Sequence, residues 1–327
     1  MRRRFQICLL AAGLAFMTAG PLAAAQSPAP ATADTAQSLY ERAQGLYKLR
    51  KYRDAIDLLN RAIELDNSVP KAYVLRGDAL ASNGDDRAAL KDYDRAIMLD
   101  SDYEYAYSTR CDTKRELEDY AGALADCNRA ISLDSTDADA FEHRGEVEYD
   151  TEDLTRAIAD FTKALSLDKQ YVYALAERCN AYRHKGDMAL ALADCNAAVA
   201  LNSKSAWSLF SRSLVSVDTQ QWVPAVEDLN RVLILDPGRT GALYYRGLAL
   251  FSLDKFQLAL DDATAYIAKS PTDPDGYQLR GKIHAARNEV APAIDDFKQA
   301  VRMYRAAGQT SDATATQKLL DKLTPPA

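Results

Sequence analysis

Apolar residues recur along the chain at helical spacing, in pairs of groups separated by a short polar break. In the stretch 70–103, small, aromatic or aliphatic side chains occupy positions 3, 4, 8 and 11, and then positions 20, 21, 24, 27 and 28. This spacing predicts two amphipathic helices. Gly84 and Asp85 lie between them, where glycine suits the end of one helix and aspartate suits the start of the next. The stretch therefore predicts an antiparallel helix hairpin with a tight turn.

The same pattern returns every 34 residues without an insertion or a deletion. Position 7 is an arginine and position 20 is an alanine in all eight units, which chance does not explain. A fixed period of this size indicates a stack of identical hairpins, a solenoid. The arginines are Arg42, Arg76, Arg110, Arg144, Arg178, Arg212, Arg246 and Arg280, and the alanines are Ala55, Ala89, Ala123, Ala157, Ala191, Ala225, Ala259 and Ala293.

The period also sets the domain organisation. Residues 1–25 combine three arginines, an apolar run and small residues before Gln26, a pattern typical of a cleavable signal peptide. Residues 26–35, rich in Pro and Ala, predict a flexible linker. Residues 308–327 predict a capping helix, from Gln309 to Leu323, and a tail. The eight units between them fill residues 36–307, as 36–69, 70–103, 104–137, 138–171, 172–205, 206–239, 240–273 and 274–307.

Individual positions of the unit resemble the tetratricopeptide repeat (TPR). Tyr73, Gly77, Ala89, Tyr93 and Ala96 stand where this family has an aromatic, a small residue, alanine, an aromatic and alanine. The arginine at position 7 departs from the family, which usually has leucine there. The resemblance implies an all-α, right-handed α-solenoid of eight TPR hairpins with a C-terminal capping helix. It also implies a non-enzymatic scaffold or adaptor that binds a peptide or partner segment in its concave groove.

Residue sizes predict how neighbouring units pack. A helical wheel places position 27 of one unit against position 3 of the next. Ala62 and Ala72 form such a pair, and pairs of alanines recur in the following units. Where position 27 becomes the bulky Tyr266, the matching position 3 shrinks to Gly276. Volume is thus conserved across the predicted contact, as close packing requires.

The arginines predict a ladder of structural ion pairs. Position 23 is an aspartate in units two to eight, and the wheel directs it toward position 7 of the next unit. We therefore predict pairs between units, such as Asp126 with Arg144, although pairing within each unit would leave only Arg42 alone. An acidic ligand is the alternative partner for these arginines. The predicted ladder comprises Asp92, Arg110, Asp126, Arg144, Asp160, Arg178, Asp194, Arg212, Asp228, Arg246, Asp262 and Arg280.

Charge narrows the range of partners. The net charge of −7 becomes −10 when the three arginines of the signal peptide are lost. An acidic protein is poorly suited to nucleic acid or to anionic membrane surfaces, both of which attract Lys and Arg. The only long apolar run lies in the signal peptide, so we expect no membrane insertion of the mature form. The sequence thus predicts export to the periplasm, or secretion, and a protein or peptide partner.

Four cysteines remain after cleavage, and they occupy positions 8 and 24 of units three and five only. These two positions face one another across the hairpin, and disulfides are expected in an exported protein. We predict the disulfides Cys111–Cys127 and Cys179–Cys195. The alternative is a volume-conserving exchange with free buried thiols.

Catalysis has little support. The three histidines, His143, His184 and His284, stand at unrelated positions of their units, and no metal-binding, phosphate-binding or nucleophile motif is present. We expect no enzyme activity, no cofactor and no metal.

The concave wall is the better candidate for function. In the resembling family it is lined by positions 2, 5, 9, 12 and 13 of the first helices. In unit four these positions form an acidic rung: Asp139, Glu142, Glu146, Tyr149 and Asp150. Units five to seven follow with an apolar and aromatic stripe, which predicts a peptide or partner site: Tyr173, Trp207, Phe210, Leu214, Val217, Tyr244, Leu248 and Phe251.

Other interpretations of the stripe stay open. Superhelical curvature could shield it, or a second copy of the chain could cover it. The protein could also be a structural subunit of an envelope complex that docks through its edges or convex face. Asn180 stands at position 9, but the lysines that accompany such an asparagine in a clamp for C-terminal carboxylates are missing.

Overall fold

The structure, a computed structural model, describes residues 34–324. The predicted signal peptide and nearly all of the predicted linker lie outside these residues. The described part of the chain forms seventeen α-helices and no strand. None of these helices has both the length and the apolar character needed to cross a bilayer.

Sixteen of the helices pair into eight antiparallel hairpins, each with a first and a second helix, and α17 (Thr310–Leu323) follows. The first helices begin 34 residues apart, in agreement with the predicted period. They are α1 (Ala36–Lys48), α3 (Pro70–Ser82), α5 (Glu104–Glu116), α7 (Ala138–Asp150), α9 (Val172–Lys185), α11 (Ala206–Asp218), α13 (Thr240–Ser252) and α15 (Pro274–Ala286). The second helices are α2 (Tyr52–Leu65), α4 (Asp86–Leu99), α6 (Tyr120–Leu133), α8 (Leu154–Leu167), α10 (Met188–Leu201), α12 (Trp222–Leu235), α14 (Phe256–Lys269) and α16 (Val290–Ala306).

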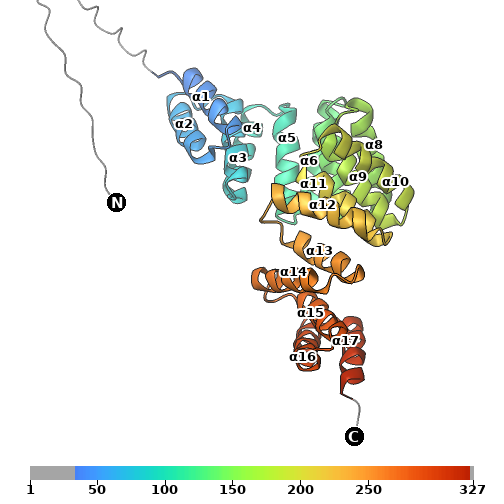
Figure 1. The fold of residues 1–327 in the computed structure, drawn as a ribbon. Coiled ribbons are helices and arrows are strands. Elements are labelled where there is room, and N and C mark those ends of the chain that lie inside the picture. The colour runs from blue at the N-terminus through green and yellow to red at the C-terminus, as the bar shows by residue number, and fades with distance from the viewer. Residues whose placement is uncertain (1–33, 325–327) are drawn as a thin grey trace, which may run out of the picture.

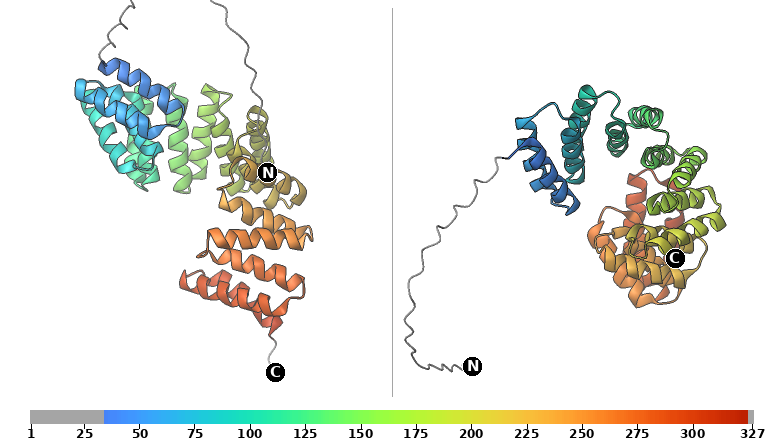
Figure 2. Two further views of the ribbon diagram at one scale, coloured as in Figure 1. Left: turned by 60° about the vertical axis from the view of Figure 1, so that its left-hand side comes forward. Right: turned by 90° about the horizontal axis from the view of Figure 1, so that it is seen from above.

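The hairpins stack in sequence order into a curved array (Figure 1), and the view from above shows the array curling around an open centre (Figure 2). First helices of adjacent hairpins contact one another, as α9 does α11, whereas each second helix contacts the first helices on either side. The path through the first helices is therefore the shorter one. They line the concave face, and the array is the all-α solenoid that the period predicts.

The turn inside each hairpin requires a left-handed backbone at position 15. All eight residues at this position have a positive φ, although only Gly84 and Gly186 are glycines. Non-glycine residues rarely adopt this conformation. The Gly-Asp break recognised in the sequence is therefore one version of a turn that Glu118 and Glu152, among others, also make with φ of 61° and 64°.

The predicted contact between positions 27 and 3 is confirmed. Ala62 and Ala72, like the other alanine pairs, are almost completely buried. A Cβ atom added to Gly276 would come within 2.8 Å of the Tyr266 ring, so the glycine is what makes room for the tyrosine. Close packing thus sets the spacing between units.

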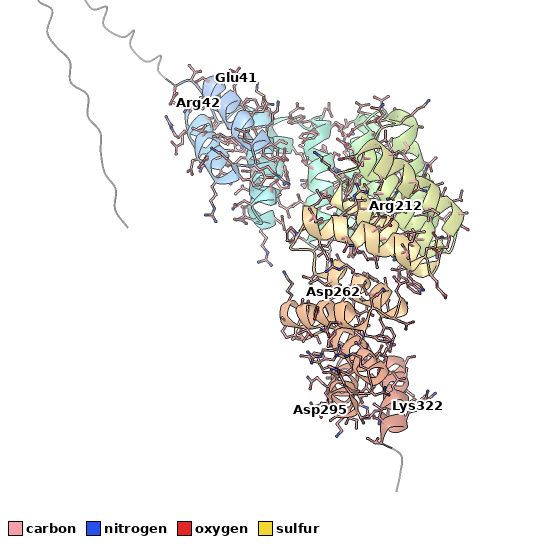
Figure 3. All side chains as sticks on the ribbon, in the orientation of Figure 1. Glu41, Arg42, Arg212, Asp262, Asp295 and Lys322 are labelled. Atoms are coloured by element: carbon pink, nitrogen blue, oxygen red, sulfur yellow. A yellow bond between two sulfur atoms is a disulfide. The ribbon has the colours of Figure 1, made fainter. Side chains whose placement is uncertain are left out.

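The ladder exists, but the predicted pairing between units is wrong. Arg144 binds Asp160 of its own unit through Nε to Oδ2 at 2.6 Å and Nη2 to Oδ1 at 2.8 Å, and it does not pair with Asp126. The same bidentate geometry joins positions 7 and 23 within units two to eight, from Arg76–Asp92 to Arg280–Asp296. Figure 3 labels two ladder members, Arg212 and Asp262.

The helical wheel predicted the wrong pairing because it represents only the direction in which a side chain leaves the helix. The arginine side chain is long enough to cross its own hairpin, with its stem packed along apolar surface. Its third nitrogen makes the link between units instead: Arg144 Nη1 donates to Asn128 Oδ1 at 2.7 Å, and Arg178 Nη1 donates to Thr162 Oγ1 at 3.0 Å. Arg42 has no aspartate at position 23 of unit one and binds Asp34.

Both predicted disulfides are present, with Cα atoms 5.4 Å apart in Cys111–Cys127 and 5.5 Å apart in Cys179–Cys195. The first joins α5 to α6, and the second joins α9 to α10. All four cysteines are completely buried. In units two, four and eight, a glycine at position 8 faces an aromatic ring at position 24, as Gly145 faces Phe161. The disulfides replace that contact in the hairpins on either side of unit four.

Candidate ligand-binding site on the concave face

The structure brings part of the predicted stripe together as a row of aromatic rings. Ring centroids of Tyr173 and Trp207 are 6.4 Å apart, and those of Trp207 and Phe210 are also 6.4 Å apart. Tyr245, which the sequence did not single out, continues the row at 5.9 Å from Phe210 and contacts Tyr244 at 5.2 Å. Aromatic pairs at such distances stabilise one another beyond their buried area.

The prediction was wrong for two residues of the stripe. Leu214 and Val217 are only 9 % and 7 % exposed, and Val217 packs in the core with Leu209. Curvature explains this burial, because α11 lies between α9 and α13 on the inner side of the array. Leu248 is partly buried in the same core, and Phe251 turns to Phe256, with ring centroids 5.9 Å apart.

A small cavity adjoins the row, and first helices alone form its walls. Its volume is about 280 Å³, and its lining comes from α5, α7, α9 and α11. Most of the lining is polar, and we call it the acidic pocket. Its members are Arg115, Glu116, Glu146, Tyr149, Asp150, Tyr173, Glu177, Asn180 and Trp207.

Hydrogen bonds between units hold the acids of the pocket in place. The hydroxyl of Tyr173 in unit five donates a hydrogen bond to Oε1 of Glu146 in unit four, at 3.0 Å. In the same way Trp207 Nε1 donates to Glu177 Oε1 at 2.5 Å. The two aromatic residues of the predicted stripe are thereby tied to two carboxylates.

One guanidinium serves most of the acids in the pocket. Arg115 Nε lies 3.3 Å from Glu146 Oε2 and Nη1 lies 3.0 Å from Asp150 Oδ2, while Nη2 is shared between Asp112 at 2.9 Å and Glu116 at 2.5 Å. Every donating nitrogen of Arg115 is thus directed at an acid of unit three or four.

Burial disfavours the charged form of these acids. Glu146 and Glu177 are 8 % and 5 % exposed, and burial raises the pKa of each to about 7. Arg115 opposes the rise at Glu146, and the Trp207 hydrogen bond opposes it at Glu177. Glu142, on the same face and 1 % exposed, has its pKa raised by burial and by the charge of Glu146. A charge buried without a sufficient partner costs free energy.

Two acceptors on this face have no hydrogen-bond partner. One is Glu142 Oε1, and the other is Oδ1 of Asn180, a residue only 5 % exposed that lines the acidic pocket. Native proteins leave few buried polar atoms unpaired, so each such atom calls for an explanation.

The histidines do not converge. His143 lies 3.1 Å from the Ser108 hydroxyl, His184 lies 3.2 Å from the Tyr149 hydroxyl, and His284 contacts Glu289 at 2.5 Å. Within residues 34–324, no group of three or more His, Cys, Asp or Glu side chains is arranged to hold a metal ion.

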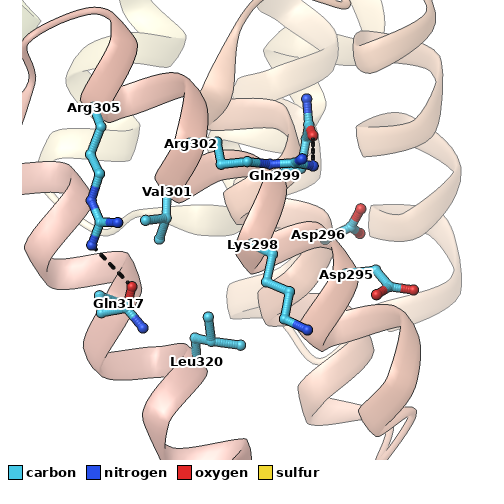
Figure 4. A pocket seen from close by; sticks show the side chains of 9 residues that line it. All are labelled: Asp295, Asp296, Lys298, Gln299, Val301, Arg302, Arg305, Gln317 and Leu320. Carbon is cyan, nitrogen blue, oxygen red and sulfur yellow. Dashed lines mark hydrogen bonds between the residues drawn. The ribbon is translucent and has the colours of Figure 1, made fainter.

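A larger hollow of about 550 Å³ lies at the C-terminal end of the array, between α16 and α17 (Figure 4). Lys298, Arg302 and Arg305 extend over it, and Arg305 donates to Gln317 Oε1 at 3.2 Å. Leu320 lies at its floor and packs with Phe297, as expected of the predicted cap. This hollow is the open edge of the last hairpin, and no buried unpaired atom lies in it.

Comparison with known proteins agrees with the repeat architecture. Family models described as tetratricopeptide repeat match residues 40–104, 112–172, 144–206 and 215–280, which together make up more than half of the chain. The chain belongs to the tetratricopeptide repeat family. No curated protein matches this TPR protein in sequence.

Solved structures share the fold at low sequence identity. The crystal structure of the APC/C hetero-tetramer Cut9–Hcn1 matches 88 % of this TPR protein with a TM-score of 0.72 at 13 % identity. The match spans 55 % of that chain. A TPR protein from Parabacteroides merdae matches 76 % of the chain and 98 % of its own length, with a TM-score of 0.56 and 19 % identity. Pseudomonas aeruginosa pilF matches 62 % and 92 %, with a TM-score of 0.53 and 18 % identity.

The sequence did not point to three members of the pocket, Arg115, Glu116 and Glu177, and it did not connect Asn180 with them. Glu177 stands at position 6, outside the positions assigned to the concave wall, and only the curvature turns it inward. Arg115 and Glu116 stand at positions 12 and 13 of unit three, one unit before the acidic rung of unit four. Asn180 was noticed but compared only with a carboxylate clamp. A search for polar residues at concave positions whose residue type changes from unit to unit would have found Arg115, Glu116 and Asn180.

Proposed function

We propose that this TPR protein is a non-enzymatic scaffold that holds an extended peptide or a partner segment against the concave face of units three to six. The observation that carries the proposal is the acidic pocket beside the aromatic row, on one face and built from consecutive first helices. Rigid aromatic side chains next to charged groups that lack full pairing are features of binding surfaces.

The proposed location is the cell envelope, as an exported and periplasmic protein. Two observations support it: the signal-peptide pattern of residues 1–25 and the two disulfides, which persist in oxidising compartments. Amino-terminal sequencing of the mature protein from envelope fractions should begin at Gln26. A mature chain that begins at Met1 would contradict the proposal.

Affinity capture from the native envelope tests the binding face. The variant Tyr173→Ala with Trp207→Ala removes two anchors of the row, while Ile234→Ala on α12 is a matched control because Ile234 is 78 % exposed. We expect the double variant to lose the partner and the control to keep it. Truncating a central aromatic anchor typically costs at least about 2 kcal/mol of binding.

The same experiment distinguishes the alternative of a structural subunit that docks through its outer surface. Met98 and Ile234, 73 % and 78 % exposed, stand at position 29 of units two and six. The other units have small or polar residues at that position, so these two side chains form no continuous apolar patch. Capture that survives the double variant and fails with Ile234→Ala would favour the outer surface.

A further inference from the structure

The acidic pocket contains more carboxyl groups than cationic groups that could pair with them. Four of its members, Glu116, Glu146, Asp150 and Glu177, have carboxylates, and Arg115 is its one cationic member. The nitrogens of Arg115 are directed at Glu146, Asp150, Glu116 and the neighbouring Asp112. Glu177 receives no ion pair from it, and its one close donor is the neutral indole of Trp207.

A second observation is independent of charge. Asn180 lies beside Glu177, whose pKa its amide lowers, and it lines the pocket, yet its Oδ1 atom is buried with no partner. The Oδ1 atom of Asn180 therefore lacks a hydrogen-bond donor. A group that is both a donor and a cation would satisfy Asn180 and Glu177 together.

The size of the pocket limits what such a group can be. A volume of about 280 Å³ lies just below the usual range for drug-sized ligands and is sufficient for one long side chain. The carboxylates are not arranged as a metal site in the described residues. Tyr173, 41 % exposed, lines the pocket, and aromatic rings attract cations.

We propose that the acidic pocket binds the lysine or arginine side chain of an extended peptide segment, whose neighbouring apolar residues lie on the row of Trp207, Phe210 and Tyr245. This assignment rests on the proposed function and specifies the chemistry of the partner. The ammonium or guanidinium group hydrogen-bonds to Glu177 and Asn180 Oδ1, and the overall charge of the protein attracts a basic segment.

The continuity of pocket and row favours a peptide over a free polyamine. Trp207 belongs to both, since it lines the pocket and its ring contacts Phe210. A ligand with a cation and no apolar neighbours would leave the row unused. Arg239, whose guanidinium lies 5.0 Å from the Trp207 ring centre and 5.1 Å from that of Phe210, shows that the row accepts a cationic side chain.

Fluorescence anisotropy with labelled peptides tests the assignment on the full mature chain. One pool of octapeptides has a central lysine among leucine, phenylalanine and serine, and a matched pool has norleucine, which has a similar length without the charge. We expect the lysine pool to bind at least tenfold more tightly. Equal binding of the two pools, or no binding of the lysine pool, overturns the proposal.

Isosteric variants locate the binding. Glu177→Gln with Asn180→Leu should weaken binding of the lysine pool at least tenfold, and Glu227→Gln, an exposed acid on α12, should leave it unchanged. A double variant that binds like the wild type overturns the proposal. Thermal unfolding checks that the variant is folded, and Glu177→Gln alone repeats the test if it is not.

Two further results separate this inference from the proposed function. Spermidine that competes fully while neither peptide pool binds would identify a free polyamine site and overturn the peptide assignment. Loss of the envelope partner in the Tyr173→Ala, Trp207→Ala variant, together with equal binding of both pools, would leave the scaffold function standing and remove the lysine or arginine subsite. Retention of the partner in that variant removes the groove function itself.

Discussion

Buried carboxylates occur in two regions of this TPR protein, and the two regions differ in how completely these carboxylates are paired with cations. In the ladder, each aspartate at position 23 has a bidentate arginine of its own, and the arrangement is repeated from unit two to unit eight. In the acidic pocket, Glu146 and Glu177 lie near a single guanidinium, that of Arg115. This combination of residues does not recur in the other units.

The comparison separates structure from function inside a repeat. A charge that recurs in every unit with a matching partner serves the architecture, since it fixes how the hairpins are built. A charge that occurs once, is buried and lacks a partner costs stability where it stands. Such a group is retained at binding sites, where a ligand supplies the missing partner.

The largest expected effect is the loss of one ladder arginine. Arg144→Met leaves Asp160 buried and unpaired, and we expect a loss of about 3–5 kcal/mol in the free energy of unfolding, measured with urea. Adding Asp160→Leu should recover most of the loss, because both charges are then gone. Recovery with Asp126→Leu in place of Asp160→Leu would show that the pairs run between units.

The disulfides come next, since they close the hairpins on either side of unit four. Reduction of both bonds should cost about 3 kcal/mol for each closed loop. Hydrogen exchange should then increase more in α5 to α10, around the acidic pocket, than in α15 and α16. A thiol titration of the denatured, oxidised protein should find none of Cys111, Cys127, Cys179 or Cys195 free. Uniform exchange, or four free thiols, would contradict this.

The acids of the pocket predict how stability depends on pH. Glu146 and Glu177 have a folded-state pKa of about 7, above the ordinary glutamate value of 4.5, so the folded state takes up protons that the unfolded state does not. Their favourable contribution is complete below about 4.5 and is lost as the pH rises through about 7.

Glu177→Gln should therefore stabilise the protein at pH 8 by about 2 kcal/mol and change little at pH 5. Arg115, Asp150, Asn180 and Trp207 face this carboxyl and are unchanged in the variant. The measurement is urea unfolding at the two pH values, with Glu227→Gln as the control. A variant that is less stable than wild type at pH 8 would show that the charge of Glu177 is well paired.

The smallest expected effect concerns the hydrogen bond between a ladder arginine and the preceding unit. Asn128→Ala removes the acceptor of Arg144 Nη1 in the preceding unit, an exposed contact of 2.7 Å. The expected loss is about 0.5–1 kcal/mol, a typical net value for one hydrogen bond. A loss as large as that of Arg144→Met would mean that the link between units, rather than the pair within a unit, holds the ladder.

The sequence predicted the fold because its repeat is uninterrupted. One helix pattern therefore described every unit, and it also predicted the contact between Tyr266 and Gly276. It did not predict features that depend on curvature or on side-chain length. Leu214 and Val217 carry the pattern of groove residues but are covered by neighbouring first helices. Arg144 reaches Asp160 because its side chain crosses the hairpin, which a wheel does not represent.

The measurement that tests the account most directly is the titration of the pocket acids by carbon-13 NMR of glutamate side-chain carboxyls, with and without the lysine peptide pool. The account predicts that Glu146 and Glu177, assigned with their glutamine variants, titrate with a pKa of about 7 in the free protein. It predicts a lower pKa for Glu177 when the peptide is bound, because a cation favours the charged carboxylate. A pKa near 4.5 for both acids in the free protein, or no change on adding the peptide, would contradict it.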